Sequence, residues 1–293
     1  MDVLLPRTLE EALEMRASRP GAIPIAGGTD LMVEINFDHL RPDAMIDVSR
    51  LPELRGWREE EGALFLGSGV TYTRILRELP HLRALAEASR SVGSPQIRNR
   101  GTVGGNLGTA SPAGDALPVL AAHDAEVGLV SAARGERWLP WDAFVLGVKA
   151  NALGPDELIL GARWRALSGP QSFSKIGTRN AMVIAVANLC FAMDPHTRSV
   201  RVALGSVAPV IVRARDAEAY LAAELEVAGA WDDLAATLPS DVVEGFAERV
   251  RAAASPIDDV RGTAAYRRHA IGVLARRALG WALAERADEA MVS

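Results

Sequence analysis

The N-terminal part of the chain alternates short apolar runs with a charged, amphipathic stretch. Thr8 stands three residues before Glu11, which is the spacing of a capping box, so we predict a helix from Thr8 to about Ser18. Apolar runs at 23–26 and 44–48 predict two strands. The pattern indicates a small βαβ-like lobe that covers residues 1–54.

The next part of the chain, residues 55–167, mixes strand and helix patterns. Strands are predicted at 63–67, 125–130 and 158–164, and helices at 72–79 and 82–91. Thr71 directly precedes the first of these helices and is a suitable N-cap. We therefore predict a second, larger lobe of mixed type.

Residues 166–170 have the composition of a linker and precede a third part of the chain, residues 168–293. Strands are predicted at 181–193 and 199–208, joined by a turn at 194–197. Farther on, apolar residues recur at helical spacing at Ile271, Leu274, Ala275, Ala278, Leu279, Ala282 and Leu283. Nearby arginines lie largely off that face, so we interpret the helix as a packing element rather than a ligand site.

Composition excludes several classes of protein. A chain of 293 residues is long enough for two or three compact lobes. The net charge of −5 and the lack of a basic stripe argue against nucleic acid as a partner. The longest apolar run, 181–193, is shorter than the roughly 18 residues of a membrane helix and is interrupted by Asn188. The N-terminus lacks a signal-peptide pattern, so we expect a cytoplasmic protein without membrane insertion.

Cysteine and histidine usage argues against a metal centre in this chain. Cys190 is the single cysteine, whereas an iron–sulfur cluster takes about four. Its apolar surroundings predict a buried, unreactive thiol. The five histidines show no metal-ligand spacing. If the protein is a redox protein, its redox centre is organic.

Two glycine-rich segments carry the candidate chemistry. Segment 100–120 and segment 23–31 combine glycines with hydroxyl side chains, and turns of this kind present backbone N–H groups to anions such as phosphate. Neither contains a P-loop, and Gly67 and Gly69 lack the third glycine of a dinucleotide-binding fingerprint, so we interpret them as a strand-to-helix turn. Two such segments could hold one long ligand, for which a dinucleotide is the natural candidate.

Taken together, these segments resemble those of a known family. The sequences at 26–31 (Ala-Gly-Gly-Thr-Asp-Leu), 102–106 (Thr-Val-Gly-Gly-Asn) and 110–115 (Ala-Ser-Pro-Ala-Gly-Asp) are similar to those of the FAD-binding, or medium, subunit of molybdenum hydroxylases. That family includes the medium subunit of carbon monoxide dehydrogenase and the FAD subunit of xanthine dehydrogenase. The resemblance covers nearly the whole chain.

The resemblance implies an α+β fold: a two-lobed FAD-binding domain, with a small α/β lobe and a larger mixed α+β lobe, followed by a C-terminal α+β domain with a small antiparallel sheet and helices. It implies an oxidoreductase subunit that takes electrons from the [2Fe–2S] clusters of a small partner subunit. A large, molybdopterin-binding subunit would oxidise the substrate, and NAD or another acceptor would receive the electrons from FAD. A dimer of heterotrimers is the expected assembly.

The resemblance also implies which residues bind FAD, while none is expected to be catalytic or to bind a metal. In the two glycine segments they are Ile25, Ala26, Gly27, Gly28, Thr29, Asp30, Leu31, Thr102, Val103, Gly104, Gly105 and Asn106. Backbone N–H groups of both segments are expected to hold the pyrophosphate. We expect Asp30 to turn away and cap the following backbone or to reach a flavin hydroxyl.

Three positions outside the glycine segments complete the expected site. Asp115 is expected to accept hydrogen bonds from sugar hydroxyls, and the alternative is that it caps the following helix. Ile159 is expected to contact FAD through its backbone or apolar side chain. Lys175 is expected to place a positive charge near the flavin ring.

Two other functions stay open at this point. One is a flavin-dependent oxidase or dehydrogenase that acts alone, and the other is a non-catalytic nucleotide-binding scaffold subunit. Nothing in the sequence identifies a substrate, because the family's substrates bind another subunit.

Overall fold

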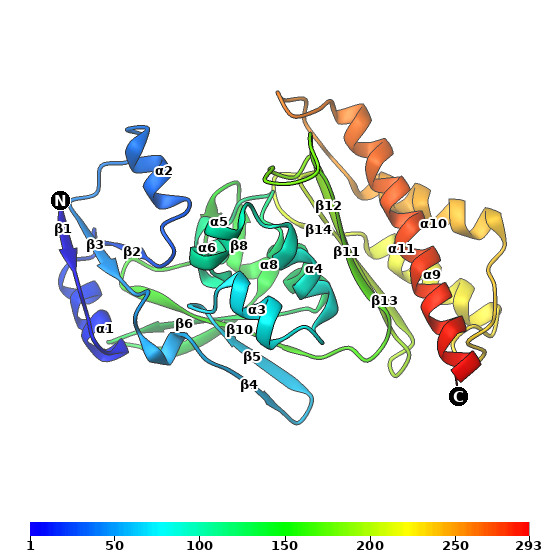
Figure 1. Ribbon diagram of the computed structural model, residues 1–293, viewed down its shortest axis with the longest axis horizontal. Helices are drawn as coiled ribbons and strands as arrows, with labels where there is room; N and C mark the ends of the chain where they lie inside the picture. The colour runs from blue at the N-terminus through cyan, green and yellow to red at the C-terminus, as the bar shows by residue number, and fades with distance from the viewer. Residues whose placement is uncertain (293) are drawn as a thin grey trace. The chain divides into compact units, whose positions relative to one another are not determined.

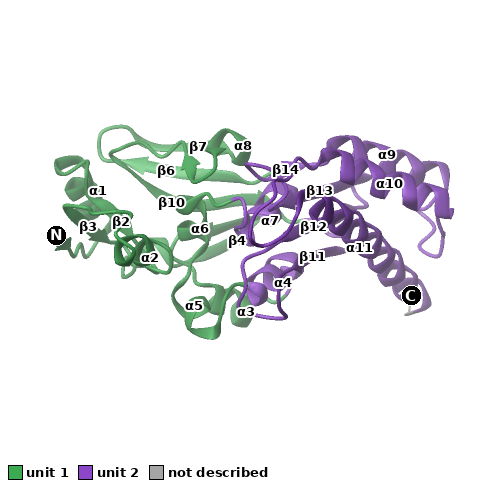
Figure 2. Cartoon of the chain, turned by 90° about the horizontal axis from the view of Figure 1, so that it is seen from above, with its two compact units in different colours: residues 1–80, 92–111, 124–166 green, residues 81–91, 112–123, 167–293 purple. Residues whose placement is uncertain are grey.

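The computed structural model describes residues 1–292, which form two compact units. Unit 1 comprises residues 1–80, 92–111 and 124–166, and unit 2 comprises residues 81–91, 112–123 and 167–293 (Figure 2). The helical segments 81–91 and 112–123 therefore belong to the same unit as the C-terminal part of the chain. The three-part division expected from sequence stays a prediction.

Unit 1 begins with a small parallel sheet. Its elements are β1 (Asp2–Leu4), α1 (Leu9–Ser18), β2 (Ile23–Ile25), α2 (Leu31–Asn36) and β3 (Ala44–Asp47), and the strand order is β1-β3-β2 (Figure 1). Thr8 caps α1 by accepting a hydrogen bond from the Glu11 N–H at 3.2 Å, which confirms the predicted helix start. The βαβ-like pattern is thus confirmed.

The rest of unit 1 surrounds a five-stranded antiparallel sheet in the order β4-β5-β10-β6-β7. The strands are β4 (Trp57–Glu60), β5 (Ala63–Gly67), β6 (Glu126–Ser131), β7 (Gly135–Pro140) and β10 (Glu157–Arg165). The accompanying elements are the 3-10 helix η1 (Pro52–Leu54), α3 (Tyr72–Glu78), α5 (Pro95–Arg100), α6 (Val103–Thr109), α8 (Trp141–Phe144), β8 (Val145–Gly147) and β9 (Ala150–Asn151). Apolar side chains of α1 and β3 pack with Leu158 and Leu160 of β10 into one core.

Unit 2 is built on a four-stranded antiparallel sheet in the order β11-β12-β13-β14. The strands are β11 (Gln171–Ile176), β12 (Ala187–Asp194), β13 (Ser199–Gly205) and β14 (Val212–Arg213). Helices α4 (Arg83–Ser91) and α7 (Ala116–Ala122) pack against one face of this sheet. Helices α9 (Arg215–Val227), α10 (Ser240–Ala253) and α11 (Ala264–Val292) cover its other face (Figure 1). The expected α+β fold with an antiparallel C-terminal sheet is confirmed.

The two faces of this sheet differ in polarity. Alternate residues of β12, among them Leu189 and Phe191, enter an apolar core with α9, α10 and α11. The buried residues Ile271, Leu274, Ala275, Ala278, Leu279 and Ala282 of α11 belong to the same core, which confirms the predicted packing face. Asn188 and Cys190 belong to the opposite set of β12 side chains, and both are fully buried.

The strand predicted at 181–193 begins later than expected. Residues 177–186 instead form a loop in which Arg179 donates a hydrogen bond to the carbonyl of Ala181 at 3.0 Å and Met182 adopts a φ of 52°. Because that left-handed conformation interrupts an extended backbone, the apolar composition of this loop does not produce a strand.

In the part of the chain that the structure describes, no helix is long and apolar enough to cross a membrane. Across the same residues, no cluster of His, Cys, Asp and Glu side chains has the arrangement of a metal site. Burial raises the pKa of the Cys190 thiol, consistent with the predicted unreactive role.

Candidate functional site

Within unit 1, the structure brings the first glycine segment next to residues 100–111 of the second. A Cβ atom built on Gly27 would lie 2.1 Å from the carbonyl oxygen of Arg100, so the two backbones touch there. The Thr109 hydroxyl donates a hydrogen bond to the Asp30 carboxylate at 3.1 Å. Segments that are about seventy residues apart in sequence thus lie side by side, and their binding of a single ligand stays a prediction.

The first segment presents free backbone N–H groups. Within the described residues, the N–H groups of Gly27, Gly28 and Thr29 donate no hydrogen bond. Gly28 has a φ of 74°, a conformation that glycine adopts without strain. Consecutive N–H groups around a left-handed residue form a concave anion site. This part of the predicted site therefore has the expected chemistry.

The second segment differs from the expectation. It is not a loop, because residues Val103–Thr109 form helix α6, with Thr102 as N-cap accepting a hydrogen bond from the Gly105 N–H at 2.9 Å. The Gly104 N–H donates to Ser68 O at 3.0 Å, and the Asn106 N–H donates to Thr102 O at 3.0 Å. These N–H groups already have partners, so the prediction that they hold an anion does not match this geometry.

The second segment presents a side-chain acceptor to a ligand, rather than backbone N–H groups. The side-chain carbonyl oxygen Oδ1 of Asn106 is buried and has no hydrogen-bond partner in the described part of the chain. A buried acceptor of this kind is costly unless a ligand or water supplies a donor. Asn106 is therefore the strongest ligand candidate in α6.

The two adjacent glycines of α6, Gly104 and Gly105, differ in what surrounds them. A Cβ on Gly104 would lie 2.3 Å from the Cβ of Ser68, so Gly104 is required for α6 to pack on the β5–α3 turn. A Cβ on Gly105 would meet only the Thr102 hydroxyl, at 3.2 Å. Gly105 therefore leaves space that internal packing does not use.

Ile159, which was predicted outside the two glycine segments, lies at a bulge of β10 in unit 1. A Cβ on Gly108 would lie 3.7 Å from the Cδ1 of Ile159, so this side chain lies beside α6. Ile159 thus joins the same region as the two glycine segments.

Asp30 does not cap a helix. It occupies the N-cap position of α2, but its side chain makes no capping hydrogen bond and binds Thr109 instead. The expectation that it caps the following backbone is wrong. Its carboxylate instead ties the first segment to α6.

Arg100 is a further residue near the first segment. Its Nε lies 3.5 Å from the carbonyl oxygen of Gly27, and among the described residues it forms no ion pair. A guanidinium group without an acidic partner favours binding of an anion close by. Sequence reasoning did not select it, although its position directly before Gly101 was a usable signal.

The other two predicted residues, Asp115 and Lys175, belong to unit 2 and form a buried ion pair. Nζ of Lys175 lies 2.6 Å from Oδ2 of Asp115, and their side chains are 9% and 5% exposed. Asp115 stands at the N-cap position of α7 without a capping hydrogen bond. The alternative that it caps this helix is therefore wrong.

Two more side chains hold the Asp115 carboxylate. The Ser91 hydroxyl donates to Oδ2 at 3.0 Å, and the Asn188 amide donates to Oδ1 at 3.1 Å. Burial raises the pKa of the Asp115 carboxyl group, while Lys175, Ser91 and Asn188 oppose that rise by stabilising the charged form. Four residues from two helices and two strands thus form one polar cluster, and sequence reasoning found two of them.

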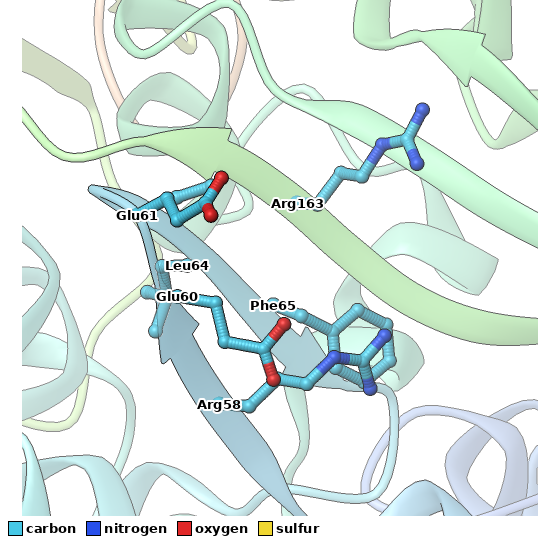
Figure 3. A pocket seen from close by; sticks show the side chains of 7 residues that line it. Arg58, Glu60, Glu61, Leu64, Phe65 and Arg163 are labelled. Carbon is cyan, nitrogen blue, oxygen red and sulfur yellow. The ribbon is translucent and has the colours of Figure 1, made fainter.

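Unit 1 also has a pocket beside the β4–β5 hairpin (Figure 3). It is lined by Arg58, Glu60, Glu61, Ala63, Leu64, Phe65 and Arg163. The guanidinium of Arg58 lies 4.2 Å from the centre of the Phe65 ring. The lining shares no residue with the predicted site.

Comparisons with known protein families and proteins agree with the sequence resemblance. Residues 1–163 match the family described as "FAD binding domain in molybdopterin dehydrogenase", and residues 172–282 match "CO dehydrogenase flavoprotein C-terminal domain". The match to the FAD-binding domain alone covers more than half of the chain.

Two relatives of known sequence and one solved structure illustrate this similarity. The chain is 42% identical to the nicotinate dehydrogenase FAD-subunit of Eubacterium barkeri over 62% of its own length and 64% of that relative's. It is 28% identical to a putative xanthine dehydrogenase FAD-binding subunit of Escherichia coli (strain K12), with 94% of each chain covered. Among solved structures, carbon monoxide dehydrogenase from Hydrogenophaga pseudoflava matches with a TM-score of 0.85 and 28% identity over 98% of each chain.

Proposed function

Since the chain belongs to the family of FAD-binding proteins of the molybdopterin dehydrogenases, we propose that it is the electron-transfer subunit of a molybdenum-containing hydroxylase or dehydrogenase. The observation that carries the proposal is the run of free N–H groups at Gly27, Gly28 and Thr29, joined to α6 by the Asp30–Thr109 hydrogen bond. Such a site suits the pyrophosphate of a dinucleotide.

The residues in unit 1 fit FAD by their chemistry. Gly27, Gly28 and Thr29 supply N–H donors to a pyrophosphate, and the positive charge of Arg100 is close to the same segment. The buried, unpartnered Oδ1 of Asn106 is suited to accept a hydrogen bond from a hydroxyl group of the cofactor. The space beside Gly105 leaves room for the cofactor to approach the backbone of α6.

In unit 2, we propose that Asp115 and Lys175 also bind the cofactor. Lys175 uses two of its three N–H donors within the described residues, one for Asp115 and one for the Ser91 carbonyl at 3.1 Å, which leaves one donor for a ligand. Because Asp115 lies so close, it balances most of the positive charge of Lys175. Lys175 therefore acts on a ligand mainly as a hydrogen-bond donor rather than as a free positive charge.

When bound, FAD supplies the ability to accept and pass on electrons, and the protein binds and orients it. None of the proposed site residues needs to act as a general acid or base for this task. We propose that the electrons come from [2Fe–2S] clusters of a small partner subunit, after a substrate is oxidised at a molybdopterin centre of a large subunit. NAD or another acceptor receives them, and the assembly is a cytoplasmic dimer of heterotrimers.

The protein isolated from its native host tests this proposal against the two alternatives. We expect flavin absorption bands in the purified complex, together with stoichiometric iron and molybdenum in copurifying subunits. A flavin-containing chain that purifies alone and is bleached by an organic substrate would indicate a stand-alone oxidase. Bound nucleotide without flavin would indicate a scaffold subunit.

A further inference from the structure

Asn188 is a buried amide near the start of β12, in a run that is otherwise apolar as far as Met193. It is 0% exposed, and its Nδ2 donates a hydrogen bond to Oδ1 of Asp115 at 3.1 Å. Its own Oδ1 is buried and has no hydrogen-bond partner among the described residues. An unpartnered buried acceptor destabilises a fold, so packing and strand stability do not explain an amide at this position.

The neighbouring strands are arranged to accommodate this amide. Lys175 of β11 and Gly205 of β13 are the direct cross-strand partners of Asn188, so the three residues form one row across the sheet of unit 2. A Cβ on Gly205 would lie 2.1 Å from Oδ1 of Asn188. The absence of a side chain at Gly205 is therefore what makes room for the amide.

The contacts of the Asp115 carboxylate are divided between its two oxygens. Oδ2 accepts from Lys175 at 2.6 Å and from Ser91 at 3.0 Å. Among the described residues, Oδ1 accepts a hydrogen bond from Asn188 alone. Because donors on both oxygens fix the rotation of a carboxylate, Asn188 determines how Asp115 presents itself to Lys175 and to a ligand.

A buried ion pair of this kind is not required for stability, since well-packed apolar residues of similar volume often stabilise a fold as well or better. The cluster is therefore compatible with a role in ligand binding.

We propose that Asn188 is a positioning residue of the cofactor site: it binds Oδ1 of Asp115 and so orients the Asp115–Lys175 pair toward FAD. This inference rests on the proposed role of Asp115 and Lys175 in binding FAD. It adds a residue that acts on the cofactor through its hydrogen bond to Asp115.

A double-mutant cycle tests this inference. The FAD-free full-length chain carries Asn188→Leu, Asp115→Ala or both, and each variant is titrated with FAD while flavin fluorescence is recorded. We expect each single change to raise the dissociation constant of FAD about tenfold. We expect the double variant to bind no more weakly than Asp115→Ala, because residues that act through one contact are not additive.

The matched control is Cys190→Ser, two residues along the same strand and equally buried. It is expected to lower the melting temperature without changing the dissociation constant of FAD. Gly205→Ala is the second way to disturb the amide, because its new Cβ must displace Oδ1 of Asn188. It should weaken FAD binding in the same direction as Asn188→Leu, which keeps a test available where Asn188→Leu does not fold.

The outcomes distinguish a failure of the proposed role of Asp115 from a failure of the inference about Asn188. If Asp115→Ala leaves FAD binding unchanged, the proposed role of Asp115 fails, and the inference about Asn188 fails with it. If Asp115→Ala weakens binding while Asn188→Leu and Gly205→Ala behave like Cys190→Ser, only the inference about Asn188 is overturned. Additive effects in the double variant overturn it as well.

Discussion

At the scale of single residues, adjacent glycines in α6 serve different purposes. Gly104 is required by the contact with Ser68, whereas Gly105 leaves space that only the Thr102 hydroxyl borders, at 3.2 Å. A substitution at Gly105 therefore separates cofactor binding from folding better than one at Gly104.

In the Gly67–Gly69 turn, packing explains the glycine at position 67, since a Cβ on Gly67 would lie 2.4 Å from the Leu54 carbonyl oxygen.

Gly105→Ala is expected to weaken FAD binding at least tenfold while changing the free energy of unfolding by no more than about 1 kcal/mol. The gain in helix propensity of roughly 1 kcal/mol offsets the close contact with Thr102. Gly104→Ala is expected to lower the melting temperature markedly because its Cβ overlaps Ser68.

Flavin titration and thermal unfolding of the same preparations measure both effects. Gly280→Ala in α11 is the matched control, because a Cβ there meets nothing within 4 Å. Unchanged flavin affinity in folded Gly105→Ala protein would remove α6 from the cofactor site.

At the scale of elements, one ion pair anchors the start of β10 to β7. The Glu157 carboxylate accepts hydrogen bonds from Nε and Nη2 of Arg137 at 2.6 and 2.7 Å, and from the Gly154 N–H at 2.7 Å. The hydrogen bond with Arg137 is the main reason that the pKa of Glu157 falls to about 2. Since Ile159 lies on the same strand, this anchor also holds one wall of the candidate site.

Because the pKa of Glu157 is lower in the folded than in the unfolded chain, its stabilising effect is complete above the unfolded value of about 4.5. It is lost as the pH falls from there toward about 2, where Glu157 becomes protonated in the folded protein. We expect Glu157→Gln to lower the free energy of unfolding by about 1–2 kcal/mol at pH 7, and to flatten its dependence on pH between pH 5 and pH 2.

Urea unfolding at several pH values measures this effect. Glu126→Gln on the neighbouring strand β6 is the comparison, because Glu126 forms an exposed pair with Arg163 at 2.8 Å. Such pairs contribute little, so its effect should stay below about 1 kcal/mol. If the free energy of unfolding depends on pH in the same way for Glu157→Gln and for the unaltered protein, the Glu157 carboxylate is not ionised as described.

At the scale of the whole molecule, the chain is expected to depend on partners for its chemistry. The proposed role of the site residues is to bind and orient a cofactor, and we expect none of them to act as an acid, base or nucleophile. We expect the FAD-loaded chain, freed of its partners, to show no reduction of its flavin by purines, aldehydes or N-heterocycles in stopped-flow absorbance. Adding back the copurified iron-containing and molybdenum-containing subunits should restore it. Reduction by an organic substrate in the isolated chain would favour a stand-alone oxidase.

The sequence by itself determined the family, the cofactor and much of the secondary structure. Local patterns were sufficient for elements with strong periodicity or caps, such as α1 after Thr8, α3 after Thr71 and the packing face of α11. They were not sufficient for α6, because glycine is a poor helix former, and its glycines were interpreted as a loop. Tertiary contacts with Ser68 and the cap at Thr102 decide that this segment is helical.

The same division applies to the site. Gly27, Gly28 and Thr29 could be predicted from sequence as donors of free N–H groups because the geometry of a glycine turn is local. Only the tertiary structure showed that Asp115 binds Lys175 rather than capping α7, and that Ser91 and Asn188 complete the cluster. In the sequence, Asn188 was visible only as a polar interruption of an apolar run. Its role depends on cross-strand register and on the space beside Gly205, and long-range packing sets both.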